Sequence, residues 1–296
     1  MTSWADLFDA SSVVIDGGMS TQLARTGYDT SGPLWTGNAL LHKPSGVVQA
    51  HRDFVEAGCN VVITCSYQIS RQGFRRIGLT DLDADLAMSA ATHAAREAVE
   101  GTSVRVAASV GPYGAVLHDG SEYRGNYGLA ASQLYDFHAE RIDTIIASEP
   151  DLLAVETIPD AREAEVLADV LSTRSTMPAW MTFTCSDSER LWAGQSIEEA
   201  VAIASSVPSI IGVGINCTDP LLISDLLARM RAVTALPLVV YPNAGGTWVS
   251  SSETWQGGGE DFTALAPSWR AIGATAIGGC CGTGASEIAA LVALLR

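Results

Sequence analysis

The sequence predicts an α/β protein of the (β/α)8 barrel class, the TIM barrel, with residues 1–296 forming a single domain. Short β-branched runs alternate with helical patterns along the whole chain. Most of these runs are apolar throughout, as parallel strands buried on both faces are. The chain has eight such units of about 37 residues on average, close to the size of one barrel unit. An open doubly wound sheet is built from the same units, but their number favours the barrel.

The eight predicted strands are separated by polar or glycine-rich turns. In a barrel their carboxyl ends share one rim, and (β/α)8 active sites are built at that rim. Two long connections leave the same rim, 111–129 after the third strand and 242–259 after the seventh. In chain order the predicted strands are Ser12–Asp16, Asn60–Ser66, Ser103–Val110, Asp151–Glu156, Ala179–Thr184, Ile210–Ile215, Pro237–Tyr241 and Ala274–Gly278.

The segments between the strands carry helix signals. Val47 to Ala57 has apolar residues at three- and four-residue steps and is followed by Gly58, a residue typical of helix ends. Other helix starts are marked by capping residues, because their side chains satisfy free N–H groups. Capping boxes are predicted at Asp160–Glu163 and Ser196–Glu199, a cap followed by proline at Thr218–Pro220, and a last helix from about Ser286.

Composition and charge restrict the classes of function. Lys and Arg total 17 against 33 Asp and Glu, so the net charge is −16. Such a surface repels phosphate backbones and anionic membranes, which argues against a nucleic-acid partner but is compatible with a cationic small molecule. The longest uncharged segments, 200–218 and 232–252, are interrupted by proline and glycine, so no membrane span is expected. The start of the chain lacks a secretion-signal pattern, and the six cysteines then suggest a reducing, cytoplasmic compartment.

Three cysteines follow two strands that lie close together on the predicted rim. Cys217 follows the sixth strand, and Cys280 and Cys281 follow the eighth. One strand separates these two, so their loops can meet at one ion. Three thiolates with one open position suit a catalytic Zn²⁺ site. Adjacent cysteines are also common as core residues, so core packing remains an alternative. Cys65 and Cys185 also lie at strand ends, and either is a candidate for the fourth position.

Seven motifs spread over the chain resemble those of the homocysteine S-methyltransferase family. They are Asp16–Leu23, Thr64–Gln68, Gly111–Gly114 with Asp119–Tyr123, Glu156–Pro159, Gly214–Cys217, Tyr241–Asn243 and Gly278–Thr283. The match follows the family's order over nearly the whole chain. It implies a (β/α)8 barrel that holds zinc through Cys217, Cys280 and Cys281. Cys65 departs from the pattern, because a small residue without a thiol is expected there.

The resemblance also implies an activity. The family transfers a methyl group to the sulfur of homocysteine and so produces methionine. The Pro33-Leu34-Trp35 segment and the Tyr67 motif look most like the branch that uses S-methylmethionine or, less efficiently, S-adenosylmethionine. The betaine branch is less similar, and the folate-dependent relatives carry modules for which 296 residues leave no room. The implied partners are therefore small molecules, homocysteine and a sulfonium donor, and the implied cofactor is Zn²⁺.

Homocysteine needs partners for its ammonium and carboxylate groups. Asp16 and Glu156 are the candidates for the ammonium, and Glu156 is the stronger because a carboxylate ending an apolar strand is costly to bury without a partner. A cap or turn role is the alternative for Asp16. The N–H groups of Gly17 and Gly18 are predicted to bind the carboxylate. Asn216 is predicted to orient a loop or the substrate.

A sulfonium cation is attracted to aromatic faces and to negative charge. Trp35, Tyr67, Tyr113 and Trp248 are therefore candidates for the donor site, although scattered aromatics more often pack in cores. Two competing interpretations remain. One is a sensor that binds metal through its thiols without turnover, and the other is a barrel hydrolase that uses the Asp16 and Glu156 carboxylates as a pair.

Overall fold

The computed structural model describes residues 13–28, 34, 36–245, 247–249, 254–256 and 261–296. Eight parallel strands form its main sheet, and each overlaps one predicted strand. They are β1 (Val13–Val14), β2 (Val61–Ile63), β3 (Arg105–Val110), β4 (Leu152–Ile158), β5 (Ala179–Phe183), β6 (Ile210–Asn216), β7 (Leu238–Tyr241) and β10 (Ala274–Ile277).

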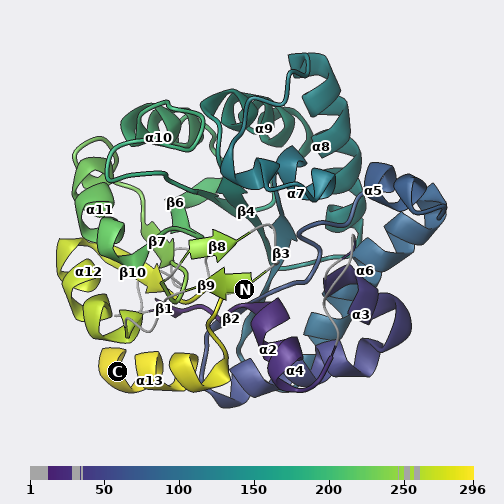
Figure 1. Cartoon of the computed structure of the whole chain (residues 1–296), viewed down its shortest axis with the longest axis horizontal. Coiled ribbons are helices and arrows are strands. Elements are labelled where there is room, and N and C mark those ends of the chain that lie inside the picture. The colour runs from purple at the N-terminus through teal and green to yellow at the C-terminus, as the bar shows by residue number, and fades with distance from the viewer. Residues whose placement is uncertain (1–12, 29–33, 35, 246, 250–253, 257–260) are drawn as a thin grey trace.

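The main sheet closes on itself. Its hydrogen-bonded order is β1-β10-β7-β6-β5-β4-β3-β2. A parallel bridge between Ile15 and Val61 joins the first strand of this order to the last, and the Asp16 N–H donates to the Val61 carbonyl at 3.0 Å. Helices surround the strands in Figure 1. The predicted (β/α)8 barrel is therefore confirmed.

The outer helices alternate with the strands along the chain. They are α2 (Met19–Arg25), α3 (Thr36–His42), α4 (Pro44–Glu56), α5 (Arg71–Arg76), α6 (Asp81–Ala98), α7 (Tyr113–Leu117), α8 (Ala131–Ala147), α9 (Ala161–Arg174), α10 (Ile197–Ser205), α11 (Ile223–Arg231), α12 (Ala266–Ile272) and α13 (Ala285–Leu295). Three short 3₁₀ helices are η1 (Ser121–Tyr123), η2 (Pro220–Leu222) and η3 (Phe262–Leu265), and a two-stranded antiparallel hairpin pairs β8 (Thr247–Val249) with β9 (Thr254–Gln256).

Capping side chains begin several helices where the sequence predicts them. Ser196 accepts a hydrogen bond from the Glu199 N–H at the start of α10, and Asp219 caps η2 ahead of Pro220. Asp160 caps α9 by accepting from a backbone N–H of its first turn. A capping box also requires the Glu163 carboxylate to accept from the Asp160 N–H, and this part of the prediction is wrong. The Glu163 carboxylate points into the protein and accepts other hydrogen bonds.

Side chains of the strands divide between two cores. On β4, Leu153 packs in the large core shared with the helices, whereas Leu152 and Ala154 belong to a smaller cluster formed by strand residues. Trp180 and Tyr241 are the largest members of that cluster, and the Trp180 indole N–H donates to the Tyr241 hydroxyl at 3.2 Å. The barrel interior is thus filled, and ligand space has to lie at an end of the barrel.

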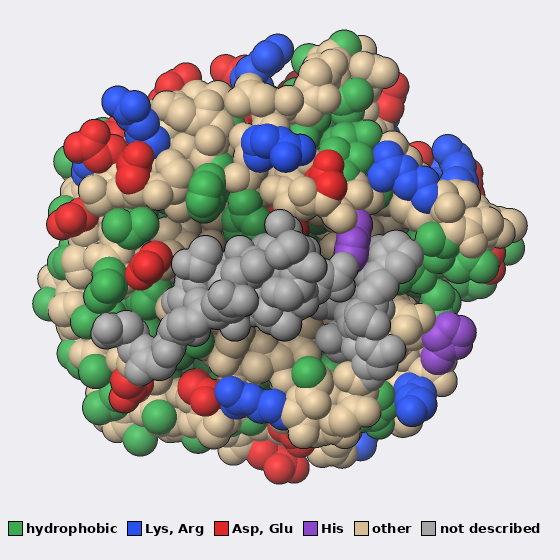
Figure 2. All heavy atoms as spheres, in the orientation of Figure 1, with side chains coloured by type: hydrophobic (Ala, Val, Ile, Leu, Met, Phe, Trp, Pro, Cys, Tyr) green, Lys and Arg blue, Asp and Glu red, His purple; other side chains and the backbone are tan. Residues whose placement is uncertain are grey.

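The surface carries charges of both signs. Acidic and basic side chains are interspersed around the periphery of the face in Figure 2. One ion pair connects the two ends of the described chain, because Arg25 on α2 lies 2.6 Å from Glu287 on α13. No helix in the described part of the chain has the length and apolar character needed to cross a membrane.

Candidate active site and metal centre

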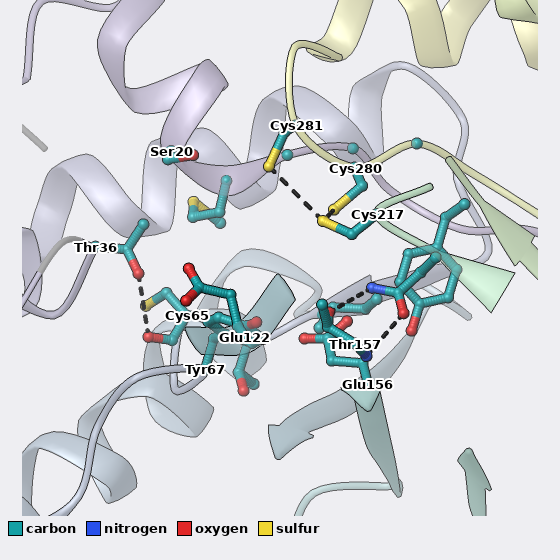
Figure 3. A pocket seen from close by; sticks show the side chains of 18 of the residues that line it. Ser20, Thr36, Cys65, Tyr67, Glu122, Glu156, Thr157, Cys217, Cys280 and Cys281 are labelled. Carbon is teal, nitrogen blue, oxygen red and sulfur yellow. Dashed lines mark hydrogen bonds between the residues drawn. The ribbon is translucent and has the colours of Figure 1, made fainter. Parts of the chain in front are cut away.

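Three cysteine sulfurs converge at the carboxyl end of the barrel. The Sγ atoms of Cys217, Cys280 and Cys281 lie within 4.8 Å of one another, and Cys217 is 2.7 Å from Cys280 and 3.8 Å from Cys281 (Figure 3). A tetrahedral ion with sulfur bonds of ~2.3 Å holds its ligands about 3.8 Å apart. The spacing from Cys217 to Cys281 fits such an ion, and Cys280 would move outward by about 1 Å. The group can therefore hold a thiol-preferring metal.

The backbone fixes these loops in place. Cys217 has a φ of 49°, a left-handed conformation that is uncommon outside glycine. Its N–H donates to the Tyr241 carbonyl at 3.2 Å, and the Cys280 N–H donates to the Pro242 carbonyl at 2.7 Å. Both cysteine loops are thus tied to the end of β7, which lies between β6 and β10. Hydrogen bonds from Cys280 and Cys281 lower the pKa of the Cys217 thiol well below its ordinary value.

The glycines after β1 allow the Cys280 loop to approach. A Cβ atom on Gly18 would lie 2.5 Å from the Cys280 carbonyl oxygen, so a larger residue cannot be accommodated there without a shift. The Gly18 N–H donates to the Thr283 carbonyl at 2.9 Å, so this N–H is already used within the protein, and its predicted contact with a substrate carboxylate stays a prediction. Gly17 and Gly18 line the pocket beside the thiols, as do Met19 and Ser20 in the first turn of α2.

A pocket of about 710 Å³, its open mouth included, lies beside the three thiols. Figure 3 shows Glu122, Glu156 and Thr157 on its walls together with the cysteines. Among the described residues that line it, none is Lys, Arg or His. The pocket therefore combines thiols and carboxylates without a cationic side chain to neutralise them, and positive charge has to come from a ligand.

Glu156 lies on β4 and opens to this pocket, with 7% of its surface exposed. Its Oε1 accepts a short hydrogen bond from the Ser109 hydroxyl on β3. Burial raises the pKa of the Glu156 carboxyl to about 7. A cation beside the carboxylate would offset this cost, so the geometry is suited to an ammonium ligand.

Asp16 is placed differently from the prediction. Its side chain is 2% exposed and is not among those that line the pocket. Its Oδ2 accepts a hydrogen bond from the Ile63 N–H at 2.8 Å, which joins the end of β1 to the end of β2. Burial raises the pKa of Asp16 well above its ordinary value. The structure therefore favours the structural alternative for Asp16 over an ammonium contact.

Asn216 connects three strands beside the three thiols. Its Oδ1 accepts from the Thr157 N–H at 2.7 Å and from the Thr182 hydroxyl at 2.8 Å, and its amide donates to the Thr157 hydroxyl at 2.7 Å. Thr157 needs this support, because its φ of 62° is rare for a β-branched residue. Asn216 thus holds the residue after Glu156 and precedes Cys217, with one amide N–H left for a ligand.

The four aromatic candidates for the donor site have different positions. Tyr67 lines the pocket. Tyr113 does not: its ring packs against Tyr127 and Phe137 at centroid distances of 5.3 and 5.0 Å, so its predicted donor role is not supported. Trp35 lies outside the described residues. Trp248 falls in β8, but its side chain is outside the described part.

Glu122 and Tyr123 are among the pocket residues that were not assigned a role from the sequence. Both lie in η1 within the long connection after β3, and both line the pocket. The Tyr123 hydroxyl donates to the Cys217 sulfur at 3.5 Å. The sequence did offer one sign of a role in the site, because both residues belong to a motif on a loop expected at the rim.

The two cysteines considered for a fourth metal ligand are both buried, and only Cys65 lines the pocket. Neither belongs to the thiol group found among the described residues.

Fold and site together define a (β/α)8 protein with a three-thiol centre and an acidic pocket at the carboxyl ends of its strands. The chain belongs to the homocysteine S-methyltransferase family, because the family model of that description matches residues 13–295. This confirms the family inferred from the seven motifs.

Named relatives and solved structures agree with this assignment. The homocysteine S-methyltransferase of Escherichia coli K12 is 38% identical over 95% of this chain and 94% of its own length. A selenocysteine methyltransferase of Astragalus bisulcatus is 38% identical over 95% of this chain and 92% of its own. The crystal structure of the metallated E. coli homocysteine methyltransferase MmuM has a TM-score of 0.88 at 36% identity and covers 98% of both chains.

Proposed function

We propose that the protein is a zinc-dependent homocysteine S-methyltransferase that takes a methyl group from a sulfonium donor and produces methionine. S-methylmethionine is the expected donor, and S-adenosylmethionine is a less efficient one. The observation that carries the proposal is the convergence of three thiols from two loops on the wall of a pocket rich in carboxylates. The named activity of the E. coli relative supports it.

Cys217, Cys280 and Cys281 would hold the metal. Thiolates are soft ligands that suit Zn²⁺, and three protein ligands are typical of a catalytic rather than a structural zinc site. When bound, Zn²⁺ lowers the pKa of a coordinated thiol, so that the homocysteine sulfur is a thiolate at neutral pH. Tyr123 would orient Cys217 through its hydroxyl hydrogen bond.

The remaining groups of homocysteine have partners on the pocket wall. Glu156 would accept the ammonium group, because it opens to the pocket from the end of a buried strand. The carboxylate would meet backbone N–H groups of the turn after β1, where Gly17 lines the pocket beside the thiols. These contacts aim the thiolate without taking part in the bond changes.

Methyl transfer then needs positioning more than proton transfer. The electron pair of the homocysteine thiolate forms the new S–CH₃ bond, while the bond from the methyl group to the sulfonium breaks. The donor sulfur keeps the electrons of that bond and becomes a neutral thioether. Tyr67 and Tyr123 line the pocket and can attract the sulfonium by cation–π interaction. No general base is required after the thiol proton has left.

A donor panel tests the proposal. Methionine formation from homocysteine is followed with S-methylmethionine and S-adenosylmethionine, before and after metal removal, and again after Zn²⁺ is restored. We expect turnover that is lost on chelation and recovered with zinc. Full turnover without metal would contradict the zinc role. Metal binding without consumption of any donor would favour the sensor interpretation. Selenocysteine is included as a second acceptor because of the Astragalus relative's name.

A further inference from the structure

Glu122 is a pocket carboxylate that the proposed chemistry leaves unused. It lies in η1, in the long connection that follows β3, and its side chain lines the pocket. Figure 3 shows it extending into the cavity, toward the wall that contains Thr36 and Cys65. Its neighbour in sequence, Tyr123, contacts the Cys217 sulfur, so Glu122 belongs to the part of the loop that lies over the metal centre.

One oxygen of the Glu122 carboxylate, Oε2, lacks a protein partner among the described residues. This oxygen is shielded from solvent and accepts no hydrogen bond from any residue that the structure describes. Burial raises the pKa of this carboxyl to about 7. Leaving a shielded carboxylate oxygen without a partner is unfavourable, and the described pocket lining provides no cationic side chain. A positively charged ligand group would supply the missing partner.

We propose that Glu122 binds the α-ammonium group of the methyl donor and so selects sulfonium donors that are amino acids. This inference rests on the proposed function. The reactants carry three positive groups, namely the ammonium of homocysteine, the ammonium of the donor and the sulfonium. Glu156, on β4 among the strand ends, is already suited to homocysteine. Glu122 extends from the rim loop on another wall and therefore remains for the donor.

The ammonium is a better partner for Glu122 than the sulfonium is. The sulfonium loses its charge as the methyl group moves, so a carboxylate bound to it would stabilise the ground state more than the transition state and slow the reaction. The ammonium charge does not change during the reaction. A carboxylate bound to the ammonium stabilises both states equally, and it lowers the donor KM without changing kcat.

The test is Glu122→Gln, which keeps the side-chain size and removes the charge. We expect the KM for S-methylmethionine to rise at least about tenfold, with kcat and the homocysteine KM within about twofold of wild type. Calorimetric titration of S-methylmethionine into zinc-loaded protein without homocysteine should show the same loss in affinity. Glu165→Gln, an exposed change on α9 with the same change in net charge, should alter none of these values.

A second measurement on the wild type does not depend on the variant folding. Dimethylsulfoniopropionate carries a methyl-bearing sulfonium and a carboxylate but no ammonium, and we expect its KM to exceed that of S-methylmethionine at least about tenfold. In Glu122→Gln the two donors should become alike in KM.

Three results would overturn the assignment of Glu122: an unchanged donor KM in the variant, a rise in the homocysteine KM instead, or equal KM values for both donors in wild type. A wild type that transfers methyl groups from no donor would overturn the proposed function itself.

Discussion

Glu163 on α9 and Glu156 on β4 are almost equally buried, at 1% and 7% exposure, but their surroundings differ. Both oxygens of Glu163 are used by the protein: Oε1 accepts from the Tyr113 N–H at 2.6 Å and lies 2.9 Å from His138 Nε2, and Oε2 accepts from the Tyr127 hydroxyl at 3.0 Å. Glu156 also has protein partners, the Ser109 and Tyr241 hydroxyls, but its side chain lines the pocket. Burial alone therefore does not identify a binding carboxylate; access to the pocket separates the two roles.

The network around Glu163 serves the site indirectly. Arg141 on α8 is fully buried and donates to three backbone carbonyls, those of Tyr67, Ile69 and Gly111, at 2.9 to 3.0 Å. These carbonyls belong to the connections after β2 and β3, which carry Tyr67 and the η1 residues of the pocket. One set of buried charges thus fixes the loops, and a second set is left for ligands.

The largest expected effect is the loss of activity when a cysteine of the three-thiol group is replaced, compared with replacement of a buried cysteine outside that group. Cys217→Ala should lose stoichiometric zinc and reduce methyl transfer by about three orders of magnitude or more, because the substrate thiol is no longer activated. Cys185→Ala, a buried thiol outside the centre, is the matched control and should keep both. Metal analysis and steady-state kinetics check this. A Cys217→Ala protein with full zinc and turnover would remove the thiol centre from the mechanism.

Replacement of Glu163 tests whether this buried carboxylate stabilises the fold. Glu163→Ala leaves the Tyr113 N–H, the Tyr127 hydroxyl and His138 without their shared partner. The free energy of unfolding should fall by about 3–5 kcal/mol, as measured by urea denaturation. Glu165→Ala, an exposed change on the same helix, should alter it by less than about 0.5 kcal/mol. Similar stabilities for the two variants would show that the network is not structural.

Removal of the Glu156 charge tests whether this carboxylate binds the ammonium group of homocysteine. Glu156→Gln should raise the homocysteine KM by about tenfold or more, because a charge-assisted contact to the ammonium is lost. Its stability should not fall as that of Glu163→Ala does. Initial rates at varied homocysteine and saturating donor check this, and an unchanged KM would exclude Glu156 from the acceptor site.

The pH dependence of stability should also distinguish Glu156. Its pKa is raised from 4.5 to about 7 by burial, so between these values the folded protein keeps a proton that the unfolded chain has released. Stability therefore falls as pH rises through this window. In metal-free protein, Glu156→Gln should gain about 3 kcal/mol relative to wild type as the pH rises from 4.5 to about 7, and no more above it. The free energy of unfolding is measured by urea denaturation at several pH values. The same pH dependence in both proteins would contradict the raised pKa of Glu156.

The smallest expected effect concerns Tyr113. Tyr113→Phe removes the hydroxyl that accepts from the Gln72 amide and keeps the ring contacts. Stability should fall by no more than about 1 kcal/mol, and the donor KM should not change, because the ring lies outside the pocket. A raised donor KM would return Tyr113 to the donor site.

The parts of the molecule that the sequence predicts well are local ones. The strands follow from short apolar runs, and the positions of Cys217 and Glu156 follow from where those runs end. Residues whose partners lie far along the chain were assigned less well. Asp16 bonds Ile63 across the closure of the barrel, and the Gly18 N–H is taken by Thr283 near the other end of the chain. Neither contact can be inferred without the register of β1 against its neighbours.

Glu163 and Tyr113 show a second kind of difference. Glu163 stands where a capping box places its acidic residue, and Tyr113 lies in a motif of a rim loop, so each had a plausible local role. The fold instead brings the two together, and the Tyr113 N–H bonds the Glu163 carboxylate. Tyr123, ten residues further along the same connection, is the tyrosine that reaches the thiols. The path of a long loop decides such roles, and local pattern does not encode that path.

The central claim is that three protein thiols hold a metal and leave room for the substrate sulfur. X-ray absorption of the zinc-loaded protein, with selenohomocysteine in place of homocysteine, measures this directly. We expect a zinc centre with three sulfur neighbours at ~2.3 Å to gain one selenium neighbour when the substrate is added. A zinc centre that already has four protein ligands, and that shows no selenium neighbour at saturating substrate, would contradict the account.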